Sequence, residues 1–415
     1  MSVAVIGAGA VGIATALALA ERGEAPDVFD PEEPAAGASH GNAGVISPWS
    51  CVPVAMPGMW RQAPRWLMDP EGPLAVRPSY ALRFLPWALK FLAAGRADRV
   101  ERTADAMQAL CRPSVEHYRR NLEGTGAEHL VVDTSYIYVA RDRTALGLDG
   151  LSWAMRRARG APLEVVEGED LRRLEPALGP DYTAAAVLSG QARALDPGAV
   201  GRAIAAKAEG LGARFHRAAV EALTPGADGG WRLEIREGDG RRSHQATRVV
   251  LAAGAWSARL LAPLGIRVPL EAERGYHVVL ADPGVEVMNS VMETSGHFVS
   301  SSMAAGVRLA GTAEYAGIDA PPDWRRAEVL VRQARRLFPD INTASVTRWM
   351  GRRPSLPDSL PCIGPVPGQR GLIAAFGHSH WGFMQAPETG RLAAGLATGA
   401  TPNIDLAPYA VERFA

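Results

Sequence analysis

The feature that most constrains this chain is a short apolar strand, Val3 to Ile6, that runs directly into the glycine-rich turn GAGAVG and an alanine-rich helix. In this turn Gly7 permits the tight reversal, Gly9 lets a pyrophosphate approach the backbone, and Gly12 lets the helix pack on the strand. The free N–H groups of the helix N-terminus and its partial positive charge then form an anion site. The pattern predicts an α/β fold with a dinucleotide site at this turn.

An acid stands where the ribose of such a dinucleotide is expected. Asp30 ends the segment Val28-Phe29, which is typical of a second strand, and lies 18 residues after Gly12. A carboxylate at this spacing accepts a hydrogen bond from a ribose 2′-OH and repels a 2′-phosphate. The alternative is a glycine-rich turn without a ligand.

Composition excludes several other classes. The 415 residues suggest two or three domains, and 44 acidic residues balance 44 basic ones, which argues against a nucleic-acid partner. Three cysteines without CxxC or Cys/His spacing predict neither disulfides nor a metal site, and a reducing cytoplasm fits. The uncharged run Ser2 to Ala20 contains three glycines and is expected to be a buried strand and helix rather than a membrane span.

The strand, glycine turn and helix pattern returns later in the chain. The segment Leu195 to Gly198 is typical of a capped helix start, Val249 to Leu251 leads into a close turn, and Leu372 to Phe376 leads into Gly377 and another helix. Alternating segments between these blocks are typical of an antiparallel sheet. We therefore expect a discontinuous Rossmann-like cofactor domain (1–50, 190–262 and 340–415) and a substrate-binding domain of mainly antiparallel sheet plus helices (51–189 and 263–339).

Taken together and in order, the motifs resemble the D-amino-acid oxidase superfamily of FAD enzymes, and more narrowly its bacterial D-amino-acid dehydrogenase branch. They span essentially the whole chain: GAGAVG, SHGNAGVISP, LDPGAV, VVLAAGAWS, ERGYHV, AGTAEY, GRRPSLPDSLPCIGP and AFGHSHWGF. The resemblance implies FAD held without a covalent bond. In one covalent group the linking His falls where this chain has Gly41, and the linking Cys of another has no evident counterpart here.

The resemblance also implies which residues lie against FAD. It places Gly7, Gly9 and Gly12 under the pyrophosphate and Asp30 on the adenosine ribose, as the residues themselves predict. The backbone of Val220 matches a position beside adenine, and the other matching positions are Ser39, Asn42, Ala43, Gly44, Gly254, Gly377, Gly382, Phe383 and Met384.

Three residues are candidates for the substrate, which presents a carboxylate, a nitrogen and a Cα–H. Arg353 matches the arginine before Pro354 that binds the carboxylate in relatives, where a planar fork gives two hydrogen bonds; Arg352 is expected to point elsewhere. Tyr276 either donates its hydroxyl to the carboxylate or covers the pocket, or it is a buried sheet tyrosine. His380 either accepts a proton from the substrate ammonium or is structural.

These residues favour an FAD-dependent dehydrogenase that oxidises a D-amino acid or a cyclic imino acid, such as D-proline or D-hydroxyproline, by hydride transfer from Cα to flavin N5. No lysine follows Lys207. Some oxidases of the superfamily use a lysine above the flavin to activate oxygen, so another acceptor, such as a quinone, is favoured. The alternatives are an oxidase of glycine- or sarcosine-like secondary amines, an NAD-dependent dehydrogenase, and a flavin-binding scaffold without catalysis.

The stretch from Met56 to Arg99 interleaves tryptophans, phenylalanines and leucines with arginines. A basic amphipathic surface has this composition and would give peripheral contact with the inner face of the membrane. Six prolines interrupt the stretch, which favours a lid or a pair of domain-facing helices. The chain is accordingly expected in the cytoplasm, with membrane contact at most peripheral.

Overall fold

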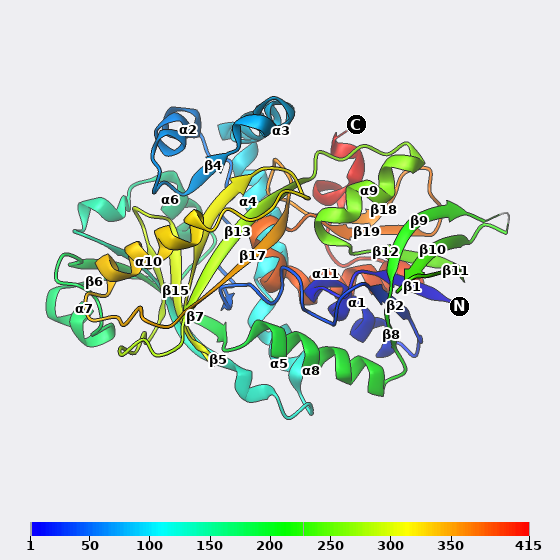
Figure 1. The fold of residues 1–415 in the computed structure, drawn as a ribbon, viewed down its shortest axis with the longest axis horizontal. Helices are drawn as coiled ribbons and strands as arrows, with labels where there is room; N and C mark the ends of the chain where they lie inside the picture. Colours follow the sequence, from blue (N-terminus) through cyan, green and yellow to red (C-terminus); the bar gives the residue numbers. More distant parts are fainter. Residues whose placement is uncertain (1, 227, 415) are drawn as a thin grey trace.

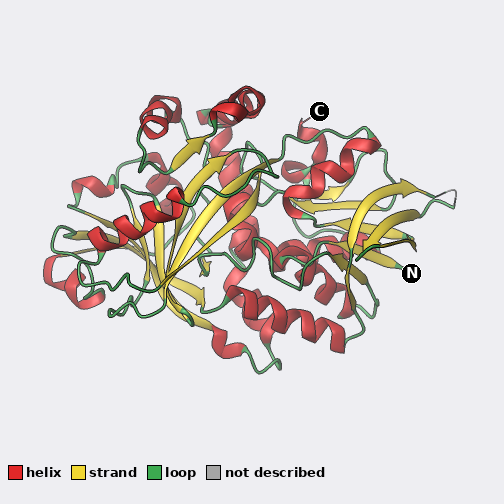
Figure 2. Ribbon diagram, viewed as in Figure 1, coloured by secondary structure: helices red, strands yellow, loops and turns green. Residues whose placement is uncertain are grey.

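Two large sheets organise the computed structural model, which describes residues 2–226 and 228–414 (Figures 1 and 2). The smaller one has six strands and is parallel except at one edge. Its order is β18 (Cys362–Pro365), β19 (Leu372–Phe376), β12 (Arg248–Leu251), β1 (Val3–Ile6), β2 (Asp27–Asp30) and β8 (Arg214–Arg217). This is the expected Rossmann-like unit, assembled from three separate parts of the chain.

The two faces of this sheet are covered differently. On one face α1 (Ala10–Ala20) packs against α8 (Pro197–Gly210) and α11 (Gly382–Thr398) in a common apolar core. The other face is covered by a three-stranded sheet, in the order β11 (Gly240–Ala246), β10 (Trp231–Glu237) and β9 (Ala219–Pro225), and by α9 (Ser257–Leu261). Both faces of the six-stranded sheet are therefore buried. This burial is expected, because the central strands of this sheet consist almost entirely of apolar residues.

The second sheet is mixed and mainly antiparallel. Its path is β17 (Val346–Ser355), β13 (Glu271–Leu280), β16 (Gly306–Tyr315), β15 (Phe298–Met303), β14 (Ser290–Glu293), β5 (Val131–Ala140), β7 (Ala184–Ala194) and β3 (Val45–Ile46); β4 (Leu74–Val76) and β6 (Leu163–Glu167) pair at its sides. The helix α10 (Arg325–Leu337) packs on β13 and β16. The remaining helices are α2 (Met59–Met68), α3 (Ala81–Ala94), α4 (Ala97–Cys111), α5 (Ser114–Leu122), α6 (Leu151–Ala158) and α7 (Gly168–Leu174).

The predicted domain boundaries need correction. Residues 340–415 were expected to belong to the cofactor domain, but β17 pairs with β13 along its whole length and so belongs to the second sheet. The chain crosses to the six-stranded sheet only after Ser355, through the turn that leads to β18. The second sheet also takes β3 and the end of β7, residues 190–194, which were expected in the cofactor domain. The rest of the division stays a prediction.

The segment rich in tryptophan and arginine forms α2 and α3, which lie at one edge of the molecule above the second sheet (Figure 1). The inward side of α3 carries Phe84 and Trp87, which stack on each other and contact Tyr315 of β16. Its outward side exposes Leu82, Leu85 and Leu89. Within the described ranges, no helix combines the length and apolar character needed to cross a membrane.

Candidate active site

A single continuous cavity of about 1850 Å³ extends from the glycine turn after β1 to the strands β13 and β17 of the second sheet. Pockets for drug-sized ligands usually measure about 300–1,000 Å³. The cavity therefore has room for a large cofactor and a small second molecule. One end of the cavity lies at the six-stranded sheet and the other end lies at the second sheet. Residues that are far apart in the sequence therefore line the same cavity.

The three glycines of the turn have three different surroundings. Gly7 has a left-handed φ of 105°, and a Cβ there would lie 2.4 Å from the carbonyl oxygen of Ala252. A Cβ on Gly12 would lie 1.8 Å from the carbonyl oxygen of Gly7, so helix and strand touch only because this position has no side chain. A Cβ on Gly9 would meet only the Ser39 hydroxyl at 3.6 Å and otherwise point into the cavity.

The start of α1 leaves backbone amides for an anion. Its N-cap is Gly9, which has no side chain to cap the helix. One amide of the first turn is engaged, since the Ser39 Oγ accepts a hydrogen bond of 2.8 Å from the N–H of Ala10. The amides of this first turn fit the pyrophosphate of a dinucleotide.

Asp30 is held rigidly at the edge of the cavity. Its Oδ2 accepts from the N–H of Ala8 at 2.7 Å, and its Oδ1 accepts from the N–H of Glu32 at 2.9 Å. Burial raises the pKa of this carboxyl, and the two backbone hydrogen bonds counteract that rise. Carboxylate oxygens have further lone pairs, so the fixed group can accept the ribose hydroxyl that the spacing predicts.

Most of the other predicted cofactor positions also line this cavity. Val220 lies on β9, the edge strand of the three-stranded sheet, so one edge of its backbone is unpaired with any strand. Gly254, with φ of 53°, follows β12. Ser39, Asn42, Ala43, Gly377, Gly382, Phe383 and Met384 line the cavity as well.

Gly12 and Gly44 are not among the residues that line the cavity, and both allow close packing of the backbone. Gly44 has φ of 77°, and a Cβ there would lie 2.5 Å from the carbonyl oxygen of Ala194. Its N–H donates to the Asn42 side chain at 2.8 Å, which closes the turn. The turn in turn presents Asn42 and Ala43 to the cavity.

Gly41 lies directly against the ring of Trp349. A Cβ at Gly41 would fall 1.8 Å from that ring, which stacks on His277 at a centroid distance of 5.0 Å. In one group of relatives with covalently bound flavin, the linking histidine is expected at the position of Gly41. In this chain the Trp349 ring leaves no room for a side chain at that position. The neighbouring His40 packs edge-on against the same indole.

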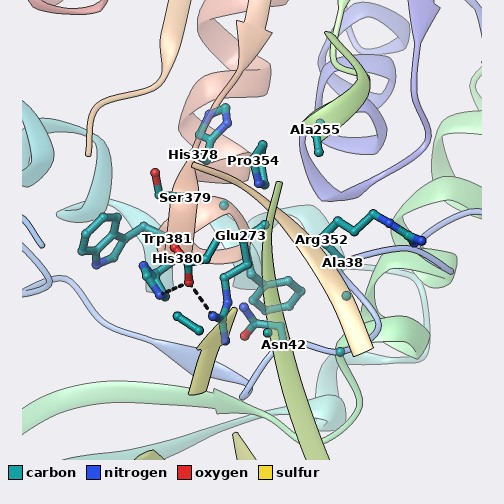
Figure 3. A pocket seen from close by; sticks show the side chains of 18 of the residues that line it. Ala38, Asn42, Ala255, Glu273, Arg352, Pro354, His378, Ser379, His380 and Trp381 are labelled. Atoms are coloured by element: carbon teal, nitrogen blue, oxygen red, sulfur yellow. Dashed lines mark hydrogen bonds and ion pairs between the residues drawn. The ribbon is translucent and has the colours of Figure 1, made fainter. Parts of the chain in front are cut away.

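At the other end of the cavity, Arg353 of β17 carries the guanidinium predicted to bind a carboxylate. Its side chain is 22% exposed, and its Nη1 donates to Glu273 at 2.7 Å. Longer contacts of about 3.4–3.5 Å reach the carbonyls of Thr312 and Gly311, and no partner is recorded for Nε among the described residues. Arg352 also lines the cavity, but its side chain extends away from Glu273 in Figure 3. Its Nε donates to the carbonyl of Ile318.

Glu273 of β13 is the residue that sequence reasoning missed. Its carboxylate lies between the Arg353 guanidinium and the His380 imidazole, and Figure 3 shows Glu273 beside His380. The side chain is only 4% exposed, and His380 Nε2 lies 2.8 Å from Oε1. Burial alone would raise the pKa of this carboxyl, but the facing His380 and Arg353 and the Ser355 hydroxyl hold that pKa well below its usual range.

His380 lies in the short turn before α11 and faces the cavity, with its side chain 36% exposed. The nearby His378 has a different environment. Its ring is buried and pairs with the Thr389 hydroxyl at 3.0 Å, and burial lowers its pKa to about 3. His378 is therefore a neutral structural residue, and His380 is the imidazole available to a ligand.

The hydroxyl of Tyr276 is engaged away from Arg353. It donates to Glu314 at 2.5 Å and accepts from the N–H of Asp323 at 2.8 Å. Burial and the neighbouring Glu314 raise the pKa of Tyr276 to about 12. Tyr276 lines the same cavity as Arg353, but its hydroxyl is engaged by Glu314 and Asp323, so its role in carboxylate binding stays a prediction.

A family of known proteins matches this architecture. A sequence model of the FAD dependent oxidoreductase family, DAO, matches residues 2–396. The chain belongs to this family. As an FAD-dependent oxidoreductase, it requires a site for that cofactor, and the fixed acid, the uncapped helix start and the open Gly9 position fit FAD.

Individual relatives align with this chain over nearly its full length. A protein of Bradyrhizobium diazoefficiens named D-amino-acid oxidase is 38% identical over 99% of this chain and 98% of its own length. One of Rhizobium johnstonii named D-amino acid dehydrogenase is 31% identical, with both chains covered in full. The crystal structure of glycine oxidase from Geobacillus kaustophilus superposes with a TM-score of 0.73 at 24% identity, over 99% of this chain and 97% of that one, which supports the fold.

Proposed function

We propose that this oxidoreductase dehydrogenates a D-amino acid or a D-configured cyclic imino acid, such as D-proline or D-hydroxyproline, to the corresponding imine. The observation that carries the proposal is the placement of Arg353 and His380 in the same cavity as the cofactor turn. The names of the two relatives, an oxidase and a dehydrogenase of D-amino acids, support the substrate class. Both share more than 30% of their residues with this chain over nearly its full length.

The substrate carboxylate would bind to Arg353. A guanidinium stays protonated at any working pH and offers two parallel N–H groups to a carboxylate. Nη1 already holds Glu273 and Nη2 makes only a long contact of 3.5 Å to the carbonyl of Gly311, so the Nε and Nη2 edge is the one that would meet the substrate. This fixes the α-carbon relative to the protein and leaves the amine to be handled by a second group.

FAD, when bound, supplies an acceptor for the two electrons and the hydrogen that leave Cα. The protein contributes alignment and exclusion of water. The aromatic side chains of α3, including Phe84 and Trp87, line the cavity and form an apolar wall beside Tyr315. A compact, ring-shaped or apolar substrate side chain would suit this wall.

The electron acceptor is the second part of the proposal. No lysine follows Lys207 in the sequence, and we propose an acceptor other than oxygen, with a quinone as the candidate. The outward leucines of α3, with Leu85 52% and Leu89 58% exposed, would provide a peripheral contact with a membrane surface. Sedimentation with phospholipid vesicles tests this contact, and protein that stays entirely in the supernatant contradicts it.

The deciding experiment is anaerobic mixing of the purified flavoprotein with D- and L-amino acids, including both epimers of proline and hydroxyproline. Bleaching of the flavin band by D-forms is the expected result. The panel also includes glycine and sarcosine, and bleaching by these two alone would instead favour the oxidase of glycine- or sarcosine-like amines. A flavin that no substrate reduces would contradict the proposal and favour a scaffold, and a purified protein without flavin would favour NAD. Repeating the reaction in air distinguishes an oxidase from a dehydrogenase.

A further inference from the structure

Glu273 lies at the centre of a polar cluster that carboxylate binding alone does not explain. Its Oε1 accepts a hydrogen bond of 2.7 Å from Arg353 Nη1, and His380 Nε2 lies 2.8 Å from the same oxygen. Its Oε2 accepts from the Ser355 hydroxyl at 2.8 Å and from the Tyr315 hydroxyl at 3.3 Å. Burying a carboxylate is costly unless it is fully paired, and here both oxygens are. The cluster therefore holds one permanent negative charge inside the cavity wall.

This geometry fixes the hydrogen of His380. An ionised carboxylate can only accept hydrogen bonds, so the Nε2 that faces Glu273 carries the hydrogen. In the neutral ring the other nitrogen, Nδ1, then has the free lone pair. Among residues 2–226 and 228–414, Nδ1 has no recorded hydrogen-bond partner, and the ring is partly exposed to the cavity.

Arg353 and His380 both meet the same Glu273 oxygen, at 2.7 and 2.8 Å. The titratable or charged groups that contact the pair come from three strands: Glu273 of β13, Tyr315 of β16 and Arg353 of β17. An imidazolium formed later would gain the attraction of Glu273.

We propose that Glu273 and His380 act as a proton-accepting pair, in which Glu273 orients the ring and Nδ1 of His380 takes a proton from the substrate ammonium. An N–H bond of the ammonium breaks, a bond between Nδ1 and hydrogen forms, and the electron pair stays on the substrate nitrogen. That lone pair must be free before the hydrogen can leave Cα as hydride. His380 is the catalytic residue and Glu273 the positioning residue, and the inference rests on the proposed function.

The substitution Glu273→Gln tests the charge while keeping the shape. The amide oxygen can still accept from Arg353 and His380, and the amide N–H₂ can donate to the Ser355 hydroxyl. A matched control is Glu388→Gln, because Glu388 of α11 is also a buried carboxylate that pairs with an arginine and a histidine, Arg391 and His117, outside the cavity lining.

The first measurement is flavin reduction by D-proline, or by another D-amino acid that reduces the holoenzyme, in anaerobic stopped flow from pH 5.5 to 10. With Glu273→Gln and with His380→Gln, we expect the reduction rate constant at pH 7 to fall about 10²- to 10⁴-fold. The rising limb of the pH profile should move toward the pKa of the substrate ammonium itself. Glu388→Gln should match the wild type.

The second measurement separates amine handling from carboxylate binding. Tetrahydro-2-furoate is a proline analogue with oxygen in place of nitrogen, so it tests the Arg353 contact alone by perturbation of the flavin spectrum. We expect Glu273→Gln to change its Kd less than about threefold. If the variant weakens this ligand as much as the substrate and leaves the pH limb in place, Glu273 only holds Arg353 and the inference is wrong.

The third measurement needs no turnover. The ¹⁵N spectrum of histidine-labelled holoenzyme, with the signal of His380 assigned by its loss in His380→Gln, should show a neutral ring protonated at Nε2. A ring protonated at Nδ1, or at both nitrogens at pH 7.5, overturns the inference even if the enzyme is active. If no amino acid reduces the flavin, the proposed function fails, and the tautomer still decides the pairing of Glu273 with His380.

Discussion

Exchanging Gly9 or Gly12 for alanine should separate binding of the cofactor from stability of the fold. A Cβ on Gly12 would lie 1.8 Å from a backbone oxygen, and neither partner can move away without shifting strand or helix. A Cβ on Gly9 would meet only the Ser39 hydroxyl at 3.6 Å, which is an ordinary contact. The φ of Gly9 is −72°, a conformation that alanine adopts without strain.

The magnitudes follow from these contacts. Gly12→Ala overpacks the junction and should lower the free energy of unfolding of the apoprotein by about 3 kcal/mol or more. For Gly9→Ala, the poorer N-cap costs about 0.3–1.5 kcal/mol, and the smaller entropy of the unfolded chain returns about 0.4–1 kcal/mol. The net change should stay within about 1 kcal/mol. The new methyl group points into the cavity at the phosphate turn, so FAD binding should weaken about 10- to 100-fold.

Two assays on each variant test this separation: thermal unfolding of the apoprotein, and FAD titration by fluorescence quenching. Gly210→Ala is the control, because this glycine ends α8 and a Cβ there has open space around it. It should change neither FAD affinity nor, by more than about 1 kcal/mol, stability. Unchanged FAD affinity in Gly9→Ala would refute the placement of the phosphates, and an unfolded Gly9→Ala apoprotein would refute the packing argument.

Further substitutions should have distinct signatures. Arg353→Lys keeps the charge but loses the planar fork, so the substrate KM should rise about 10- to 100-fold while FAD affinity stays unchanged; steady-state kinetics that match the wild type would contradict the carboxylate assignment. Gly41→Ala should destabilise the protein by about 1–3 kcal/mol because its Cβ meets the Trp349 ring, and differential scanning calorimetry measures this cost. Asp27→Asn should cost the apoprotein about 2 kcal/mol at pH 7: burial raises the pKa of Asp27, but hydrogen bonds from Arg214 and His216 hold it at about 2, below the ordinary value of 3.8 that applies in the unfolded chain. Since this pKa is depressed, the stabilisation is present above about pH 4 and is lost as pH falls toward 2, so urea unfolding should show the difference between Asp27→Asn and wild type shrinking over that interval; a difference independent of pH would refute the assignment.

The sequence was most informative where structure is local. The turn with Gly7, Gly9 and Gly12, its strand and its helix follow one another within twenty residues, and period and glycine spacing alone locate them. The start of α8 is equally local: Asp196 accepts from the N–H of Ala199 at 3.0 Å, with Pro197 as the first helical residue. Such elements could be predicted because each depends on neighbours in the chain.

The placement of β17 could not be predicted in the same way. The strand comes directly before segments of the six-stranded sheet, so its position in the sequence suggested the cofactor domain. In the structure it pairs with β13, whose residues lie about 80 positions earlier, as in the pair Glu273 and Arg353. Only long-range pairing shows that Arg353 enters the cavity from the second sheet.

The same pairing explains why the sequence pointed to Tyr276 and passed over Glu273. Along a strand, successive side chains face opposite sides of the sheet. On β13 both Glu273 and Tyr276 line the cavity, but the Glu273 carboxylate meets Arg353 and His380, whereas the Tyr276 hydroxyl is bonded to the Glu314 carboxylate. Motif matching identifies the segment but not its register, and a slip of one residue exchanges the two faces completely. An acid in an otherwise buried strand was the available signal, because such a residue needs a partner across the sheet, and here the partner directly opposite is Arg353.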